Sequence, residues 1–384
     1  MKRPSWRLGH VAVFLCVTVC AGLGRAGETP GGQRRLRTML RAAETLSRGL
    51  AEVRQRRGRT TPLALDEQLV WMMRAMEAGR RLADTPEERL EAIRRYVGAC
   101  KALRERVRTR RQLDASRVAL GVVDYALAEA ECLLAEALVR HGPAGQRAAQ
   151  RAAATRAGRA ALAAAGATAK DLDAIEPLRS RGVIESWELR RRWAWRVMQA
   201  RRRPAADAKQ EAAAVREYRG FCRHLLGKVA LRRTIDATVM DLAAAKHAVA
   251  EADYVLAGVL ARRAAAGGGP AAEPAPAKEQ SARAMLAAAR KVMEGFEAAR
   301  AAGVRSGATS VLLTQRHWAH KVMAAEVHLA RTARERTAAI TRYLAYCRTV
   351  RRHVEARKIA GATALDALAA EYYVAEAEHM LARE

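Results

Sequence analysis

The sequence is poor in aromatic residues, and it contains no asparagine. Aromatic side chains account for 4% of the 384 residues, and only 3 residues are Phe. Long runs of alternating β-branched or aromatic residues, which strands would need, are also missing. Half of the residues are hydrophobic, and alanine, arginine, leucine and glutamate, all strong helix formers, predominate. The composition therefore predicts an all-α protein.

A long apolar stretch stands near the N-terminus. Basic residues within the first seven positions precede the apolar segment 11–23, and the small residues Gly24 and Ala26 follow. This order is typical of a secretory signal peptide over residues 1–26, and the apolar segment is short for a membrane span. An uncleaved anchor and lipid attachment at Cys20 are the alternatives. We therefore expect an exported protein that is periplasmic or associated with the cell envelope.

Acidic residues are scarce relative to basic ones, which leaves a formal net charge of +29, carried mostly by arginine. In a cytoplasmic protein such a charge would suggest nucleic acid as a partner, but an exported protein would seldom meet any, so we expect no nucleic-acid partner. Anionic lipid headgroups or acidic envelope polymers are the natural counterparts of this field. The alternative is an arginine-biased composition spread over solvated helix faces.

Three tandem copies of one pattern follow the leader. In each copy a methionine stands five residues after a tryptophan, a tyrosine stands 25 residues after the same tryptophan, and a cysteine follows four residues later. The repeat period is 122 and then 125 residues, which indicates internal duplication. We expect these side chains to pack in the core, and they are Trp71, Met76, Tyr96, Cys100, Trp193, Met198, Tyr218, Cys222, Trp318, Met323, Tyr343 and Cys347.

Each copy is expected to form four helices in two antiparallel hairpins. In the third copy the predicted helices cover about 281–302, 310–330, a stretch ending near 358, and 363–383. Thr332-x-x-Glu335 and Thr85-Pro86-Glu87-Glu88 have the spacing of helix-starting capping boxes. The predicted helical units span 33–140, 145–262 and 279–384, with a Gly/Pro/Ala linker at 263–278.

The fourth helix of each copy carries two apolar stripes on nearly opposite faces. In the second copy one stripe contains Leu242, Ala245, Val249, Ala252 and Leu256 at alternating spacings of three and four. A helix that is apolar on two faces needs neighbours on both. The three units are therefore expected to pack as a bundle or as an α-solenoid-like array.

The third helices are rich in arginine, whereas the fourth helix of the first copy carries acidic residues such as Asp124, Glu129 and Glu131. We expect ion pairs between the two helices, although exposed pairs add little stability. The candidate anion-binding residues are Arg104, Arg108, Arg111, Arg232, Arg233, Arg351 and Arg352.

Four cysteines follow the leader, and their spacing argues against disulfides. Cys100, Cys222 and Cys347 occupy one equivalent position per copy, and Cys132 is out of register with Cys100 across the expected hairpin. We expect buried free thiols that behave as small hydrophobic side chains.

Sequence motifs for catalysis or cofactor binding are missing, including phosphate-binding Gly-rich loops, GxSxG, HExxH and CxxC. One cluster, His317, His320, Glu326 and His328, has metal-ligand residue types at helical spacing. Its counterparts in the other copies are not ligands, so we expect solvated histidines there, no cofactor, and no enzyme activity.

The segment from Val354 through Gly361 and the Leu365-Asp366-Ala-Leu368 stretch to Glu378 resembles the helical repeat of TolC-type outer-membrane efflux proteins. Residues 110–131 and 232–253 match more loosely. The resemblance covers about a third of the chain and implies an envelope protein with long antiparallel helices.

From these patterns we expect a non-catalytic exported scaffold, adaptor or interaction module. Its expected partners are other envelope proteins or further copies of itself. A TolC-like efflux component is the first alternative, and an arginine-rich binder of anionic lipid or envelope polymer is the second.

Overall fold

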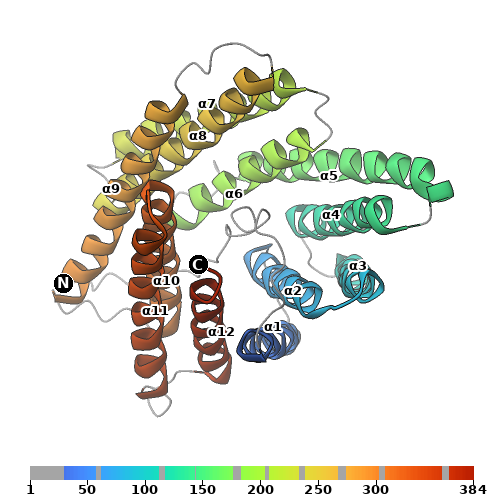
Figure 1. The fold of residues 1–384 in the computed structure, drawn as a ribbon, viewed down its shortest axis with the longest axis horizontal. Helices are drawn as coiled ribbons and strands as arrows, with labels where there is room; N and C mark the ends of the chain where they lie inside the picture. Colours follow the sequence, from blue (N-terminus) through green and yellow to red (C-terminus); the bar gives the residue numbers. More distant parts are fainter. Residues whose placement is uncertain are drawn as a thin grey trace. The chain divides into compact units, whose positions relative to one another are not determined.

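The computed structural model describes residues 30–57, 62–111, 117–142, 144–175, 183–203, 207–232, 238–266, 274–301, 308–356 and 363–384. Within these ranges the chain forms twelve α-helices, one short 3₁₀ turn and no strand (Figure 1). The all-α class is therefore confirmed. The signal peptide predicted over residues 1–26 lies outside the described residues.

Each sequence copy forms four helices, as predicted. The first copy contains α1 (Pro30–Arg57), α2 (Pro62–Leu82), α3 (Pro86–Arg111) and α4 (Arg117–His141). After the 3₁₀ turn η1 (Ala144–Gln146), the second contains α5 (Arg147–Ile175), α6 (Val183–Arg202), α7 (Ala208–Arg232) and α8 (Val239–Ala266). The third contains α9 (Pro274–Ala301), α10 (Ala308–Leu329), α11 (Ala333–Ala356) and α12 (Ala364–Leu381).

The linker predicted at 263–278 is shorter than expected. Helix α8 continues to Ala266 and α9 begins at Pro274. The physical reason is local: alanine and arginine continue a helix after position 262, and proline is well tolerated in the first turn of the next helix.

Reciprocal caps fix the starts of several helices. The Thr85 hydroxyl accepts from Glu88 N at 3.2 Å, and the Glu88 carboxylate accepts from Thr85 N at 3.2 Å. The same exchange joins Thr332 and Glu335, as the spacing predicted. Thr363 also forms a capping box at the start of α12. Such caps contribute about 0.5–2 kcal/mol each.

The described helices divide into two compact units whose boundaries differ from those of the repeats. The middle unit holds the described residues of 173–346 together with Glu384, and the terminal unit holds those of 30–172 and 347–383. The third copy is thus shared between the units, because α12 packs against α1 of the first copy.

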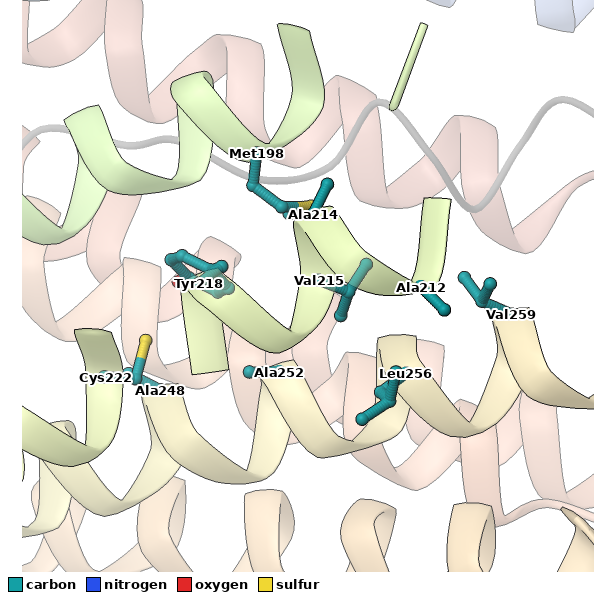
Figure 2. Packing of buried hydrophobic residues seen from close by; sticks show 10 residues of the cluster. All are labelled: Met198, Ala212, Ala214, Val215, Tyr218, Cys222, Ala248, Ala252, Leu256 and Val259. Carbon is teal, nitrogen blue, oxygen red and sulfur yellow. The ribbon is translucent and has the colours of Figure 1, made fainter. Parts of the chain in front are cut away.

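In the middle unit, α6 packs on α7, α7 on α8, α8 on α9, and α9 on α10. Figure 2 shows one core cluster of this unit, in which α7 residues lie between Met198 of α6 and small or aliphatic residues of α8. Tyr218 and Cys222 belong to it and are 2% and 1% exposed. Alanines at 212, 248 and 252 let the helices approach closely.

In the terminal unit, α1 pairs with α2 and α3 pairs with α4, while α12 lies along α1 (Figure 1). Helix α4 also approaches α5, because Cys132 Sγ lies 3.6 Å from the carbonyl oxygen of Ala154. The fourth helix of one copy therefore contacts the first helix of the next at α4–α5 and α8–α9, and α12 of the last copy contacts α1 of the first.

The α8–α9 and α12–α1 contacts are equivalent in detail. A Cβ atom added to Gly295 of α9 would overlap Met240 of α8, and one added to Gly49 of α1 would overlap Leu365 of α12. Met240 and Leu365 are separated by the repeat period of 125 residues. The last helix thus occupies, against the first, the place that each fourth helix takes against its successor.

The prediction that fourth helices have neighbours on both apolar faces holds for α8 with one qualification. Helices α7 and α9 flank α8, and Ala245 and Ala252 are buried. Leu242 and Val249 on the same stripe remain half-buried. This part of the stripe therefore faces an open groove rather than a covering helix.

Candidate functional site

Two of the repeated tryptophans, Trp71 and Trp318, contact aromatic side chains of another copy. In the terminal unit Trp71 of α2 meets Tyr372 of α12 edge to face, with ring centroids 5.1 Å apart. In the middle unit Trp318 of α10 meets His247 of α8 in the same way at 5.4 Å. Positions 247 and 372 are equivalent, since they differ by 125 residues. The fold thus uses one aromatic contact twice.

The structure buries all the repeated Trp, Met, Tyr and Cys positions. The three tryptophans are 4%, 0% and 9% exposed, and Cys100, Cys222 and Cys347 are each 1% exposed. Among the described residues these thiols and Cys132 are free cysteines. Burial raises the pKa of Cys100 to about 12, despite its hydrogen bond with Tyr96. A thiol with such a pKa is a poor nucleophile and metal ligand.

A basic residue follows each tryptophan by three positions, and the sequence analysis missed this regularity. Arg74 lies over the rings of Trp71 and Tyr372 and donates a hydrogen bond to Tyr373 Oη at 3.1 Å. The guanidinium of Arg196 lies 4.4 Å from the Trp193 ring centroid. In the third copy the equivalent residue is Lys321.

Lys321 belongs to a buried ion cluster in the middle unit. Its Nζ donates to Glu251 Oε1 at 2.6 Å, and Arg191 Nη1 lies 3.4 Å from Glu251 Oε2. Burial alone would raise the pKa of Glu251, but Lys321, His247 and Arg191 lower it to about 2. Glu251 is therefore held as a carboxylate with both oxygens engaged. A general base needs a pKa near neutrality, so this cluster is suited to fixing helices rather than to proton transfer.

Glu251 lies at a contact between copies and is only 6% exposed. Its counterpart Glu376, which stands 125 residues later, is close enough to Tyr372 to affect the pKa of that tyrosine, as Arg74 is. These equivalent acidic residues of the second and third copies therefore both lie near a contact between copies.

The candidate metal cluster on α10 does not assemble. His320 packs edge to face on Tyr343, and His328 stacks on Tyr254 with centroids 4.5 Å apart. Glu326 accepts from Arg290 and Arg342 instead. In the described part of the chain, no three His, Cys, Asp or Glu side chains are placed to hold a metal ion.

The expectation of solvated histidines on α10 is wrong for two of them. His317 and His320 are 5% and 3% exposed. Burial lowers the pKa of His317 well below its usual value, and Lys321 and Arg191 lower it further. The imidazole is therefore neutral at pH 7 and packs against Trp318.

Four of the candidate anion-binding arginines have partners within the terminal unit. Arg104 donates to Asp124 at 2.5 Å, which is one of the ion pairs expected between α3 and α4. Arg108 lies 3.6 Å from Glu105, Arg351 donates to Glu355, and Arg352 donates to Thr349. Arg111 and Arg232 end their helices, and Arg233 lies outside the described residues.

The middle unit has an apolar groove, which we call the α8 groove. It runs along α8 from Val239 to Ala264, with Leu226 of α7 on one side and residues 277–291 of α9 on the other. Its volume is about 1120 Å³. Val239 and Leu260, two of the few exposed large hydrophobic side chains, lie toward its two ends.

Few charged side chains line the α8 groove. They are Arg219, Lys246, Asp253 and Lys291. Asp253 forms an ion pair with Arg219, and Lys291 lies 3.9 Å from Glu294 of its own helix. The rest of the lining is aliphatic apart from Gln280 and Ser281. The sequence shows the apolar stripe that contains Leu242 and Val249, but only the packing of the helices shows that part of this stripe is open to solvent.

Every helix in the described ranges is either too short or too polar to cross a bilayer.

No protein-family model and no curated protein matches the sequence. A search of solved structures found a chain described as "Computational Design of Self-Assembling Cyclic Protein Homooligomers", which is 17% identical. The match covers 81% of this chain and 95% of that chain, with a TM-score of 0.21. A likeness of this quality carries no argument about fold or function.

Proposed function

We propose that this protein is a non-catalytic exported scaffold that holds another polypeptide in the α8 groove. The observation that carries the proposal is the groove itself: about 1120 Å³ of elongated, mostly aliphatic hollow between neighbouring helices. Exposed apolar surface that is continuous and rimmed by polar side chains is typical of protein-binding sites. Grooves between helices commonly receive a partner helix.

The polar clusters of the protein support this choice over catalysis. Glu251 is engaged by Lys321 and Arg191, and Glu326 by Arg290 and Arg342. Cys100 is buried, and its pKa is about 12. The two carboxylates join neighbouring helices, whereas the apolar side chains of Val239, Leu242 and Val249 line the α8 groove and are exposed or half-buried.

Export is the second part of the proposal, and it rests on the leader-like segment 1–26. A basic start, a short apolar segment and small residues at 24 and 26 are the features of a secretory signal. Fractionation of cells expressing the full chain tests it. A processed protein in the envelope or periplasmic fraction supports export, and an unprocessed cytoplasmic protein contradicts it.

Two alternatives remain as weaker proposals. Anion binding by the arginine-rich third helices would have to compete with the internal partners of Arg104 and Arg351. The TolC-like interpretation rests on the sequence resemblance near Gly361 and Leu365. Salt-dependent retention on heparin would favour the first, and detergent-dependent extraction as a trimer the second.

Photo-crosslinking in intact cells tests the scaffold. A benzophenone amino acid at Leu260, which lines the α8 groove, should give a discrete crosslinked product with another protein. The matched control position is Leu231, which is 80% exposed in the same unit and outside the groove.

Ala284→Trp, which fills the groove at an exposed alanine of α9, should abolish the product. Ala298→Trp, on the same helix but outside the groove, should preserve it. Equal labelling from Leu231, or indifference to Ala284→Trp, would overturn the proposal.

A further inference from the structure

The α8 groove has the surface pattern of a coiled-coil seam. Alanines line it at 243, 250, 257 and 264, which are successive seven-residue steps along α8. On α9 the lining residues Ala277, Ala284 and Lys291 repeat the same step. A seven-residue repeat keeps one face of a helix directed at its partner over many turns. Ala243, Ala250 and Ala257 are themselves buried, so these small side chains form the floor of the groove, over which larger side chains of a third helix can pack.

The length of the groove fits a helix and not a compact ligand. Val239 and Ala264 are 25 residues apart on one continuous helix, so the lining extends over roughly 38 Å at 1.5 Å per residue. A partner helix of about the same length would follow it from end to end. Its larger side chains would pack against Val239, Leu242, Val249, Leu256 and Leu260.

The charged side chains that line the α8 groove indicate the sign of the partner's charge. Three of the four charged lining residues are basic, and the acidic one, Asp253, is already paired with Arg219. Lys246 is exposed and has no ion-pair partner among the described residues. Lys291 has its single contact at 3.9 Å, to Glu294. Glutamate or aspartate flanking an apolar stripe would meet Lys246 on one edge and Lys291 on the other.

We infer that the α8 groove receives an acidic amphipathic helix of another protein, packed against α8 and α9 as the third member of a coiled coil. This inference rests on the proposed scaffold function and adds the chemistry of its partner. Leucine-sized side chains on the partner pack over Ala250 and Ala257, against Val249 and Leu260. Acidic side chains beside that stripe face the lysines of the rim.

Binding of synthetic helices to the full chain provides the test. The probes are two fluorescent peptides of about 25 residues with the same leucine heptad pattern, one flanked by glutamate and the other by lysine. Anisotropy should give saturable binding for the acidic peptide and binding about tenfold or more weaker for the basic one. High salt should reduce this preference. Equal affinities for both peptides would overturn the inference.

Variants of the chain assign the effect to this groove. The double substitution Lys246→Glu and Lys291→Glu should weaken the acidic peptide by about tenfold and strengthen the basic one. Ala284→Trp should weaken both peptides, whereas Ala298→Trp should change neither. Circular dichroism confirms that each variant keeps its helix content. If charge reversal and groove filling leave the acidic peptide unaffected, the peptide binds elsewhere and the inference is wrong.

The two proposals fail in different ways. A product from Leu260 whose crosslinked segment is basic or not helical would remove the acidic-helix inference and keep the scaffold. If vesicles of anionic lipid reduce crosslinking at Leu260 and the acidic peptide does not, the acidic-helix inference is likewise wrong. No product at Leu260, together with specific peptide binding, would remove the cellular role while leaving the groove's chemistry established.

Discussion

Nζ of Lys321 lies 2.6 Å from Oε1 of Glu251, although Lys321 belongs to the third sequence copy and Glu251 to the second. The two side chains are 5% and 8% exposed. The pair joins α10 to α8 beside the contact of Trp318 with His247. Two charges this deep require each other, because a lone buried ion loses its hydration without compensation. The joint between copies is therefore specified by charge as well as by shape.

Replacing Lys321 by methionine should lower the free energy of unfolding by about 3–5 kcal/mol, since it leaves Glu251 with one fewer cation in a buried site. Adding Glu251→Gln should cost less than the sum of the single effects. Lys101→Met is the control, because Lys101 lies 3.6 Å from Glu131 with both side chains exposed, and should cost under about 1 kcal/mol. Urea unfolding measures all four variants. Equal costs for Lys321→Met and Lys101→Met would contradict the assignment.

Acid should loosen the same cluster. The pKa of Glu251 is about 2 in the folded chain against an ordinary value of 4.5, so the unfolded chain binds more protons between these values. The contribution is complete above pH 4.5 and is lost as the pH falls toward 2, about 3 kcal/mol in all. Unfolding followed by circular dichroism from pH 5 to pH 2 should show this loss, and Glu251→Gln should reduce it. An identical acid profile for wild type and variant would refute the prediction.

His328 should contribute a second loss of stability at milder acidity. Burial and Lys278 lower its pKa from 6.5 to about 4, while its ring stacks on Tyr254. The unfolded chain therefore takes up the proton first, and stability falls between pH 6.5 and 4. His328→Phe keeps an aromatic ring on Tyr254 and removes the titration. Its melting temperature should change less than that of wild type over this range, and His353→Phe, at an exposed histidine, is the control.

The repeat markers predicted much of the fold because they are local. Trp71, Trp193 and Trp318 recur with fixed offsets to Met, Tyr and Cys, and such offsets place all four types on equivalent helices. The predicted third-copy helices agree with α9 to α12 except at the start of α9. The cation three residues after each tryptophan stands in the same pattern. It could have been found with equal ease.

The contacts between copies could not be predicted from the sequence, because they depend on which helices pack together. A repeat period does not say whether the last copy packs against the first, and the contact of α12 with α1 settles this in the terminal unit. His317 and His320 looked like solvated residues on an amphipathic helix, but both are buried, and His320 packs on Tyr343 of α11. The open stripe along α8 was readable as apolar, but its exposure follows from the positions of α7 and α9.

Glycine at position 121 should tolerate no larger side chain. A Cβ atom there would overlap Thr168 Oγ1 and lie 3.1 Å from Thr168 Cβ and 3.6 Å from its Cα, which sets α4 close to α5. Gly121→Ala should therefore destabilise by about 1–3 kcal/mol. Gly98→Ala is the matched control, because Gly98 is a helical glycine with nothing within 4 Å of the added atom, and should stabilise by about 0.5–1 kcal/mol. Thermal unfolding of the two variants should shift in opposite directions. A stabilised Gly121→Ala protein would show that α4 and α5 are farther apart than described.

A disulfide between positions 49 and 365 should form readily, because Leu365 Cγ lies 3.4 Å from where a Cβ of residue 49 would stand. A cysteine at 365 places its sulfur near that atom, within reach of a sulfur at 49. Gly49→Cys with Leu365→Cys should therefore give a faster-migrating band on non-reducing gels after mild oxidation. The closed loop is long, so the crosslink should add about 2–5 kcal/mol to the free energy of unfolding.

The control pair, Gly98→Cys with Leu365→Cys, should remain reduced, since a Cβ atom at position 98 has no neighbour within 4 Å. If neither pair forms a crosslink under conditions in which both cysteines are reactive, α12 does not lie along α1 in solution. The native thiols compete little, because they are buried and the pKa of Cys100 is about 12.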